Sequence, residues 1–286
     1  MAWGGWILKE LDTTAFLVAS RHCRSASPPV TVSIDSVDFI APLYRSQVVT
    51  CYGSISRTFG SSMEVKVSLI GESPGQPHIS NWPVLESYAT FVNVDQNNKP
   101  SKVPQLILET PEQEEEHVMA GKRRENRIKA TSPEFHISSH PGSRTNTYVE
   151  MTECIFRRHT NARGSAFGGQ LMAWGELASA VSAARYTPHR MVLAASNQIN
   201  FKQSVKLGDM ISLRSQVTGV FNSSLEVGLE ILKEDILSGE QTSCMTAYFT
   251  YVTLRDSAER RPVLEPFEPL TTQQQNWADA AKERKK

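Results

Sequence analysis

The sequence Asn161-Ala-Arg-Gly-Ser-Ala-Phe-Gly168-Gly169-Gln-Leu-Met-Ala-Trp-Gly-Glu176-Leu-Ala-Ser-Ala-Val-Ser-Ala-Ala-Arg185 reads as a loop that leads into one long helix. No proline follows Gly169 in this stretch, and its apolar residues cover more than the stripe of an ordinary surface helix, so we expect a helix buried on most sides. Four segments rich in Val, Ile, Leu, Phe and Tyr follow, at 191–201, 209–220, 224–233 and 243–254. They predict an antiparallel sheet that wraps around the helix.

The chain contains this plan twice, at an offset close to 160 residues. The matched blocks are Gly4–Asp12 with Gly168–Glu176, Val37–Phe39 with Ile199–Phe201, Ser61–Val65 with Ser223–Val227, and Tyr88–Val92 with Tyr248–Val252. In both copies a carboxylate, Asp12 or Glu176, stands seven residues after the second glycine of a Gly-Gly pair. A repeat of such long period indicates duplicated domains rather than a solenoid.

A length of 286 residues suits two domains of ordinary size. We predict a first domain over 1–96, a linker with a charged helix over 97–147, a second domain over 148–256 and a polar tail over 257–286. We expect the second domain to begin with a strand, Tyr148–Phe156, whereas only three residues precede Gly4. The first domain is therefore expected to lack its opening strand and a counterpart of Asn161. Either the sequence is truncated there, which we favour, or the protein tolerates an incomplete domain.

The motifs resemble those of the double-hotdog acyl-CoA thioesterases, which carry two fused hotdog domains in one chain. The likeness covers most of residues 4–255 and rests on Asn-x-x-Gly-x-x-Phe-Gly-Gly from Asn161, Ser-Ser-Met-Glu-Val from Ser61 and Tyr-Phe-Thr-Tyr-Val from Tyr248. The acidic run at 111–116 and the basic run at 122–124 are most similar to the mitochondrial branch. The resemblance implies an α+β fold of two tandem hotdog domains, each an antiparallel sheet wrapped around a long central helix, packed as a pseudo-dimer.

Composition narrows the possible partners. Thirty basic residues balance thirty acidic ones, so neither nucleic acid nor an anionic membrane is indicated, and no apolar run reaches membrane-spanning length. The four cysteines show no paired spacing, which favours a reducing compartment. The resemblance implies a mitochondrial location, with the cytoplasm as the alternative, and a homo-oligomer built as a trimer of double-hotdog chains.

Two short motifs suggest other chemistry and are set aside. Gly71-Glu-Ser73-Pro-Gly75 matches the nucleophile elbow of serine hydrolases, but Pro74 lacks the N–H that the oxyanion hole needs, so serine esterase activity is not expected. His136 and His140 have a metal-like spacing without a third ligand, so we expect no metal. We also expect no cofactor, since the substrate itself carries coenzyme A.

Thioester hydrolysis needs a polarised carbonyl group and an activated water. The N–H groups at the start of the helix that begins near Gly169 carry the positive end of its dipole and are a candidate oxyanion hole. Asn161 either positions water or substrate or simply caps its loop. By resemblance, Asn161 works with Asp12 of the other domain, which acts as general base or as nucleophile; the sequence does not choose between these roles. Glu176 would then belong to a second, defective site that lacks its asparagine.

The resemblance also implies which residues contact coenzyme A. They are Thr31, Ser33, Ser61, Ser62, Arg124, Ser196 and Asn197. The expected function is that of an acyl-CoA thioesterase, which releases free fatty acid and CoA from fatty acyl-CoA. The alternative is a non-catalytic acyl-CoA binding or scaffold protein, should the incomplete first domain disable the site.

Overall fold

The structure, a computed structural model, describes residues 4–24, 27–44, 46–75, 81–129, 137, 147–161, 163–197, 199–254 and 261–285. The first repeat forms α1 (Gly4–Cys23), β1 (Val30–Ile34), β2 (Val37–Asp38), β3 (Val48–Phe59), β4 (Ser62–Glu72), β5 (Trp82–Val92) and α2 (Pro111–Lys129). The second forms β6 (Val149–Cys154), the short 3-10 helix η1 (Arg157–His159), α3 (Gly168–Tyr186), β7 (Met191–Ser196), β8 (Ile199–Phe201), β9 (Met210–Val220), β10 (Ser224–Glu234), β11 (Gln241–Thr253) and α4 (Thr272–Arg284). The helix and the strands that the sequence predicts for the second repeat are all present.

All eleven strands belong to one antiparallel sheet that runs through both repeats. Its main order is β3-β4-β5-β1-β8-β11-β10-β9-β6, and β7 pairs with β11 and β2. The repeats join where β1 pairs with β8, and the matching pair of β7 with β2 repeats the same junction in the opposite sense. The α+β fold of two tandem hotdog domains packed as a pseudo-dimer is therefore confirmed. β6 closes one edge of the sheet and β3 forms the other.

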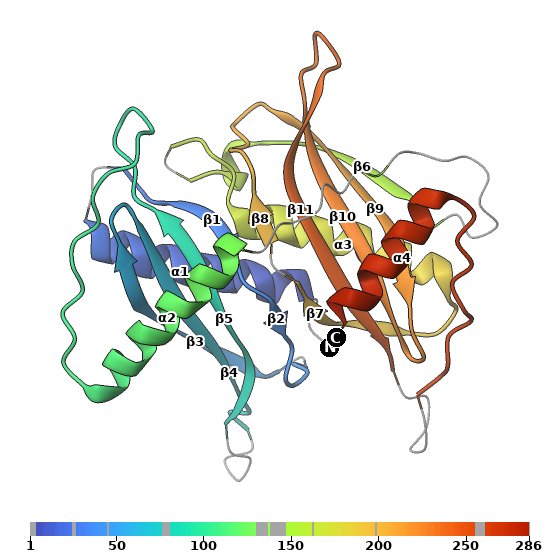
Figure 1. Cartoon of the computed structure of the whole chain (residues 1–286), viewed down its shortest axis with the longest axis horizontal. Helices are drawn as coiled ribbons and strands as arrows, with labels where there is room; N and C mark the ends of the chain where they lie inside the picture. Colours follow the sequence, from blue (N-terminus) through green and yellow to red (C-terminus); the bar gives the residue numbers. More distant parts are fainter. Residues whose placement is uncertain are drawn as a thin grey trace.

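The central helices α1 and α3 lie together on one side of the sheet, as Figure 1 shows. Their buried side chains join a single apolar core that spans both repeats. In α3 the buried residues form a stripe with a spacing of three to four, whereas Leu177 is 39% and Val181 is 37% exposed. The expectation that this helix is buried on most sides was therefore wrong, because the sheet and α1 cover only one side of it.

Two glycines let α1 and α3 cross at very short range. A Cβ atom on Gly169 would lie 2.8 Å from the Cα atom of Lys9, and a Cβ atom on Gly5 would lie 2.9 Å from the Cα atom of Ala173. Real Cβ atoms essentially never approach other atoms so closely. The first turn of each helix therefore rests directly on the backbone of the other helix, which only glycine allows.

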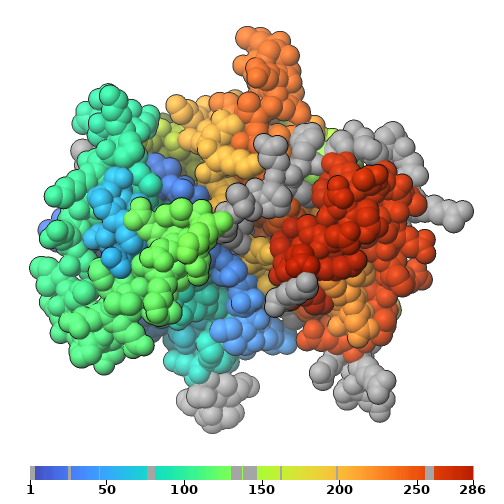
Figure 2. All heavy atoms as spheres, viewed as in Figure 1, coloured from blue at the N-terminus to red at the C-terminus, as the bar shows by residue number. Residues whose placement is uncertain are grey.

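The helices α2 and α4 cover the opposite face of the sheet (Figures 1 and 2). They make equivalent contacts in the two repeats. Each places an arginine on a buried glutamate of the sheet and over a tyrosine ring. The N–O distances of the two ion pairs are 2.7 and 2.6 Å, and the guanidinium carbons lie 3.7 and 3.6 Å from the ring centroids. The matched residues are Arg123, Glu64 and Tyr88 in the first repeat and Arg284, Glu226 and Tyr248 in the second.

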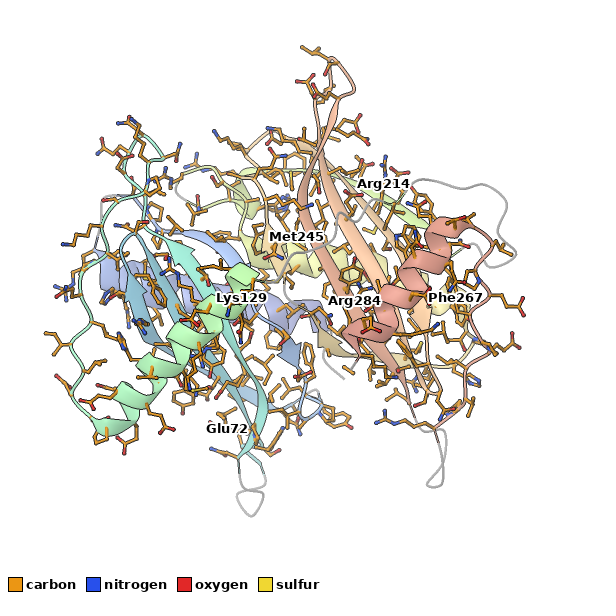
Figure 3. The ribbon with its side chains drawn as sticks, in the orientation of Figure 1. Glu72, Lys129, Arg214, Met245, Phe267 and Arg284 are labelled. Carbon is orange, nitrogen blue, oxygen red and sulfur yellow. The ribbon has the colours of Figure 1, made fainter. Side chains whose placement is uncertain are left out.

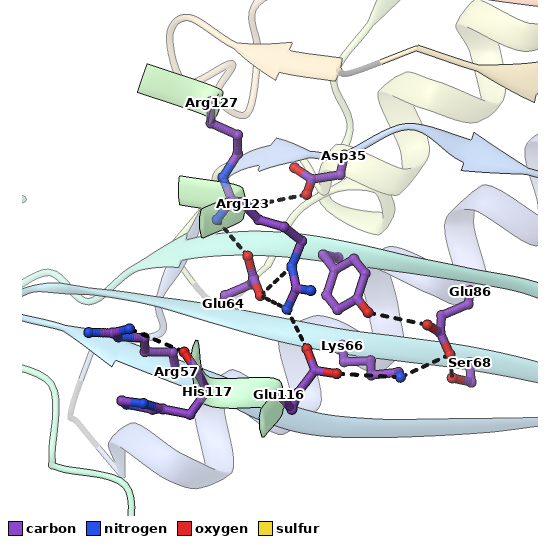
Figure 4. Close-up of polar contacts among 11 residues, drawn as sticks. Asp35, Arg57, Glu64, Lys66, Ser68, Glu86, Glu116, His117, Arg123 and Arg127 are labelled. Carbon is purple, nitrogen blue, oxygen red and sulfur yellow. Dashed lines mark hydrogen bonds and ion pairs between the residues drawn. The ribbon is translucent and has the colours of Figure 1, made fainter. Parts of the chain in front are cut away.

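The helix α2 is held to the sheet by a second arginine as well. Arg127 of α2 bridges Glu64 at 2.6 Å and Asp35 at 2.7 Å, so that α2 holds β4 and the segment after β1 together (Figure 4). The side chain of Glu64 is fully buried, and both its oxygens accept hydrogen bonds from arginine. Thus α2 and α4 pack on the repeat that precedes each of them, although the predicted domain boundaries at 96, 147 and 256 stay predictions.

We predict that Gly169→Ala destabilises the fold. Overpacking at the helix crossing costs about 1–3 kcal/mol, whereas the better helix propensity of alanine returns only about 1 kcal/mol. Urea unfolding measures the difference. Gly75→Ala is the matched control, because nothing lies within 4 Å of its added Cβ atom. If Gly169→Ala were as stable as Gly75→Ala, the close crossing would not constrain the fold.

Candidate active site

Asp12 lies in α1 with its carboxylate against the first turn of α3 in the other repeat. Oδ2 accepts a hydrogen bond from the Gly169 N–H at 2.7 Å, and Oδ1 accepts one from the Thr31 hydroxyl at 3.1 Å. The residue is only 1% exposed. Burial raises the pKa of Asp12 above its ordinary value, and the two hydrogen bonds partly offset that rise. A buried carboxylate at the positive end of a helix results.

Asn161 stands in the loop that precedes α3. Its Oδ1 atom accepts hydrogen bonds from the backbone N–H groups of Arg163 at 2.9 Å and Ser165 at 3.2 Å. The side-chain oxygen thus shapes the loop, which is the capping role considered for this residue. Because the oxygen is engaged, the NH2 group of the amide is the end that can serve a ligand.

A cavity of about 210 Å³ lies between the two repeats and brings these residues together. The first repeat supplies Phe16 and the β1 segment around Thr31, and the second supplies Asn161, Gly168 and the segment 201–205. Asp12 lies behind the wall of this cavity, since Thr31 and Gly168 both line the cavity and both contact Asp12. The wall of one cavity therefore combines an amide, a hydroxyl and a helix N-terminus, with a buried carboxylate directly behind it.

Glu176 occupies the matching position in α3, but its surroundings differ. It is 4% exposed, accepts a hydrogen bond from the Gly5 N–H and is contacted by the Tyr251 hydroxyl, which donates to its backbone carbonyl at 3.0 Å. Burial raises the pKa of Glu176 to about 7. The position that matches Thr31 is Leu193, which packs so closely that a Cβ atom on Gly4 would lie 2.5 Å from its Cδ2 atom. The second position thus keeps the carboxylate and loses the hydroxyl.

The seven residues expected to contact coenzyme A do not form one group. Thr31 lines the cavity between the repeats, and Ser33 follows it on β1 as a buried residue. Ser62 and Arg124 meet at Phe59, since Ser62 pairs with Phe59 across the β3–β4 turn, which includes Ser61, and the Arg124 guanidinium carbon lies 4.6 Å from the ring centroid.

The strand register connects this second cluster with β1. Ser62 lies opposite Val92, and Val92 lies opposite Val30, the neighbour of Thr31. The remaining two predicted contacts are further along the sheet. Ser196 is buried beside Val37 and Phe249, and the backbone N–H of Asn197 donates to the carbonyl of Tyr248.

Sequence reasoning missed the bond between Thr31 and Asp12, because it assigned Thr31 to coenzyme A. It also missed Tyr251 beside Glu176. A signal for both was present in the repeat itself. At the repeat offset Thr31 aligns with Leu193 and Phe91 aligns with Tyr251, so each carboxylate has a hydroxyl that the other copy lacks.

The two motifs set aside on sequence grounds lie apart from this site. Ser73 directly follows β4 and precedes a turn at Pro74 and Gly75, and the next described element is a strand rather than a helix. His136 and His140 lie outside the described residues. Within the described ranges, no three His, Cys, Asp or Glu residues are placed to hold a metal ion. No helix in those ranges is long and apolar enough to cross a membrane.

The fold and the site together define a tandem hotdog protein with a buried carboxylate where its repeats meet. The model of the thioesterase superfamily matches residues 1–78 and 163–240, which is more than half of the chain. The chain therefore belongs to the thioesterase superfamily.

Two of the most similar curated relatives are named as thioesterases. Mouse acyl-coenzyme A thioesterase 11 is 30% identical over 92% of this chain and 46% of its own length. Rat acetyl-coenzyme A thioesterase is 27% identical over 89% of this chain and 48% of its own length. The chain thus spans about half the length of these curated relatives. Among solved structures, an acyl-CoA hydrolase from Staphylococcus aureus is 24% identical, with a TM-score of 0.46, over 48% of this chain and 84% of that one.

We predict that Glu176 makes folding stability depend on pH. Its pKa is 4.5 in an ordinary setting and about 7 here, so between these values the folded chain keeps a proton that the unfolded chain has lost. Raising the pH across this window therefore lowers the free energy of unfolding, by up to about 3 kcal/mol. The check is the free energy of unfolding of wild type and Glu176→Gln from pH 4.5 to 7.5. Asp12 is present in both proteins, so its contribution cancels. Parallel curves would contradict the burial argument.

Proposed function

We propose that this chain is an acyl-CoA thioesterase that hydrolyses fatty acyl-CoA to free fatty acid and CoA. The observation that carries the proposal is the Asp12 carboxylate, held by the Gly169 N–H and the Thr31 hydroxyl at the wall of a cavity between the repeats. Membership of the thioesterase superfamily supports it. The names of the relatives agree with it, although the chain spans only about half of the first two.

In the proposed reaction the thioester carbonyl lies at the start of α3. The helix N-terminus and the Asn161 amide stabilise negative charge on the carbonyl oxygen as the tetrahedral intermediate forms. Asp12 either takes a proton from the attacking water or attacks the carbonyl carbon itself, and the resulting anhydride is then hydrolysed. The C–S bond breaks in both routes, and the CoA sulfur leaves as a thiolate that takes up a proton. The raised pKa of Asp12 suits the role of a base.

For the coenzyme A portion we propose the cluster of Ser61, Ser62 and Arg124 near β1 as the first contact region. Arg124 is exposed, so its charge is available to a phosphate group. We propose no separate cofactor, because the reaction needs only water and the substrate. We also propose contacts with Ser196, which is buried, and with its neighbour Asn197.

We further propose that the chain forms a homo-oligomer and works in mitochondria. The outer sides of α1 and α3 expose Trp6, Leu17, Leu177 and Val181, which favours contact with another copy. The location rests on the resemblance of residues 111–116 and 122–124 alone. Sedimentation and imaging of the tagged natural protein test the two points, and a monomer or a purely cytosolic signal would refute them.

We predict that Asp12→Asn abolishes turnover and that Glu176→Gln reduces it only modestly. Asparagine keeps an oxygen for the Gly169 N–H but can act neither as base nor as nucleophile. The measurement is release of free thiol from acyl-CoA by the purified natural protein. Glu176→Gln is the matched control, because it changes the equivalent carboxyl group of the other repeat. Equal losses would mean that the two positions do not differ in function.

The same assay separates the thioesterase from a non-catalytic acyl-CoA binding protein. Saturable binding of acyl-CoA by wild type without any thiol release would favour the binding protein. Loss of binding in Asp12→Asn would place the role of this residue in substrate recognition instead of catalysis.

We predict that Asn161→Asp slows turnover at least tenfold, since loss of one preorganised donor to an oxyanion typically costs about 10²–10³-fold. Aspartate keeps the oxygen that the loop N–H groups need, but it replaces the NH2 donor with a second oxygen and adds a negative charge, which also opposes charge on the carbonyl oxygen. Stability should change little, as urea unfolding would show. Arg163→Ala is the control, because it removes contacts of the same loop with Asp95 and Asn98 and leaves Asn161 intact. Turnover within twofold of wild type in Asn161→Asp would remove this residue from the mechanism.

A further inference from the structure

The two repeats differ at one strand position that faces the outer helix. In the first repeat the space between β3 and α2 is filled by Arg57. Its guanidinium group lies 5.2 Å from the ring centroid of Phe59 and donates to the carbonyl of His117 at 3.1 Å (Figure 4). It also lies against Gly121, where an added Cβ atom would come within 2.5 Å of it.

In the second repeat glycine replaces this arginine. Gly219 pairs with Glu226 in the same register in which Arg57 pairs with Glu64. Between β9, α4 and the segment 266–269 there is a cavity of about 260 Å³. The argument uses six of its lining residues, namely Gly219, Phe221, Phe267, Gln275, Ala278 and Lys282.

The residues around this cavity match residues around Arg57 in the first repeat. Taking the ion pairs of Arg123 and Arg284 as matched, Ala278 stands at the position of His117 and Lys282 at that of Gly121. The same offset holds at the helix starts, where the Gln113 and Gln274 side chains each accept a backbone N–H four residues earlier, both at 2.7 Å.

The aromatic walls of the cavity favour a ligand with a flat, apolar ring. Phe221 matches Phe59, whose ring faces a planar guanidinium group in the first repeat. Phe267 adds a second ring from the segment that runs beside α4 (Figure 3). Aromatic rings prefer offset or edge-to-face contact with another planar ring, so a planar aromatic ligand suits these walls.

The basic side chains at the cavity favour an anion over a cation like the one in the first repeat. Two positions become more positive between the repeats, since Lys282 replaces Gly121 and Gln275 replaces Glu114. Lys285 adds a further positive charge, with its ammonium 3.8 Å from the Phe221 ring centroid. The Lys282 side chain is 63% exposed and paired only with the exposed Asp279 in an i,i+3 contact, which holds it weakly. Its ammonium is therefore available to an anion.

We propose that this cavity binds a planar aromatic anion, with the ring between Phe221 and Phe267 and the negative group at Lys282. The site is separate from the cavity beside Asp12 and does not depend on the proposed reaction. The ligand carries its charge as a carboxylate or as a phosphate, and both share the chemistry that the cavity offers. In the first repeat the planar group beside the phenylalanine is the Arg57 guanidinium of the chain itself. In the second repeat a ligand would supply the planar group.

The test is calorimetric titration of the full chain with 2-naphthoate, a carboxylate, and with adenosine 5′-monophosphate, a phosphate. The matched probe of opposite charge is 2-naphthamidine, an amidinium of the same shape. We expect at least one of the two anions to bind, and 2-naphthamidine to bind at least tenfold more weakly than that anion. Equal or tighter binding of the amidinium, or no binding of either anion, overturns the proposal.

Two variants locate the binding. Gly219→Arg restores the side chain of the first repeat and should weaken anion binding at least tenfold. Since a Cβ atom there would lie 2.6 Å from Cβ of Ala281, this change is combined with Ala281→Gly, and Ala281→Gly alone is measured beside it. Lys282→Glu changes an exposed residue that folding does not need, and it should weaken binding to a similar degree.

The control for added charge is Leu237→Arg, which places the same side chain on a residue that is 98% exposed in the β10–β11 turn. It should leave the affinity unchanged. Anion binding that survives both Gly219→Arg with Ala281→Gly and Lys282→Glu, or that falls equally in Leu237→Arg, would show that the anion binds elsewhere and would refute the site.

Discussion

The close crossing of α1 and α3 is the constraint on which the rest of the structure depends. With glycine at the contact, the first turn of each helix rests on the backbone of the other. The carboxylate seven residues after the second glycine of each helix then accepts a hydrogen bond from the second glycine of the other helix. The core, the continuous sheet and the cavity between the repeats are all arranged around this crossing.

One framework with two different sets of side chains yields two different carboxylates. Asp12 has the hydroxyl of Thr31 and a neighbouring cavity, whereas Glu176 has the buried hydroxyl of Tyr251 and the packed side chain of Leu193. Burial raises the pKa of both groups. A cavity that both repeats line lies next to the surroundings of Asp12, whereas the Leu193 side chain packs against the start of α1 in the repeat position of Thr31.

The outer face shows the same pattern of shared framework and local change. Buried Glu64 and Glu226 each form an ion pair with an arginine from the helix that follows the strands of their own repeat. Removing the arginine from such a buried ion pair would be strongly unfavourable, because the carboxylate would stay buried without its partner. These ion pairs make α2 and α4 part of the packing of the two repeats. At one strand position the first repeat has Arg57 and the second has Gly219, and a cavity lies beside Gly219.

The sequence by itself determined the duplication, the central helices, the strands of the second repeat and the pairing of Gly-Gly with a carboxylate seven residues later. These features follow from local spacing, and local spacing is repeated at an offset near 160 residues. Only the tertiary structure decided that Thr31 bonds to Asp12, that the Asn161 oxygen caps its own loop, and that α4 packs on β9. It also decided which side of α3 is buried. Such contacts join residues that are distant in the chain or depend on which atoms face the solvent. The periodicity of a single segment predicts neither of these features.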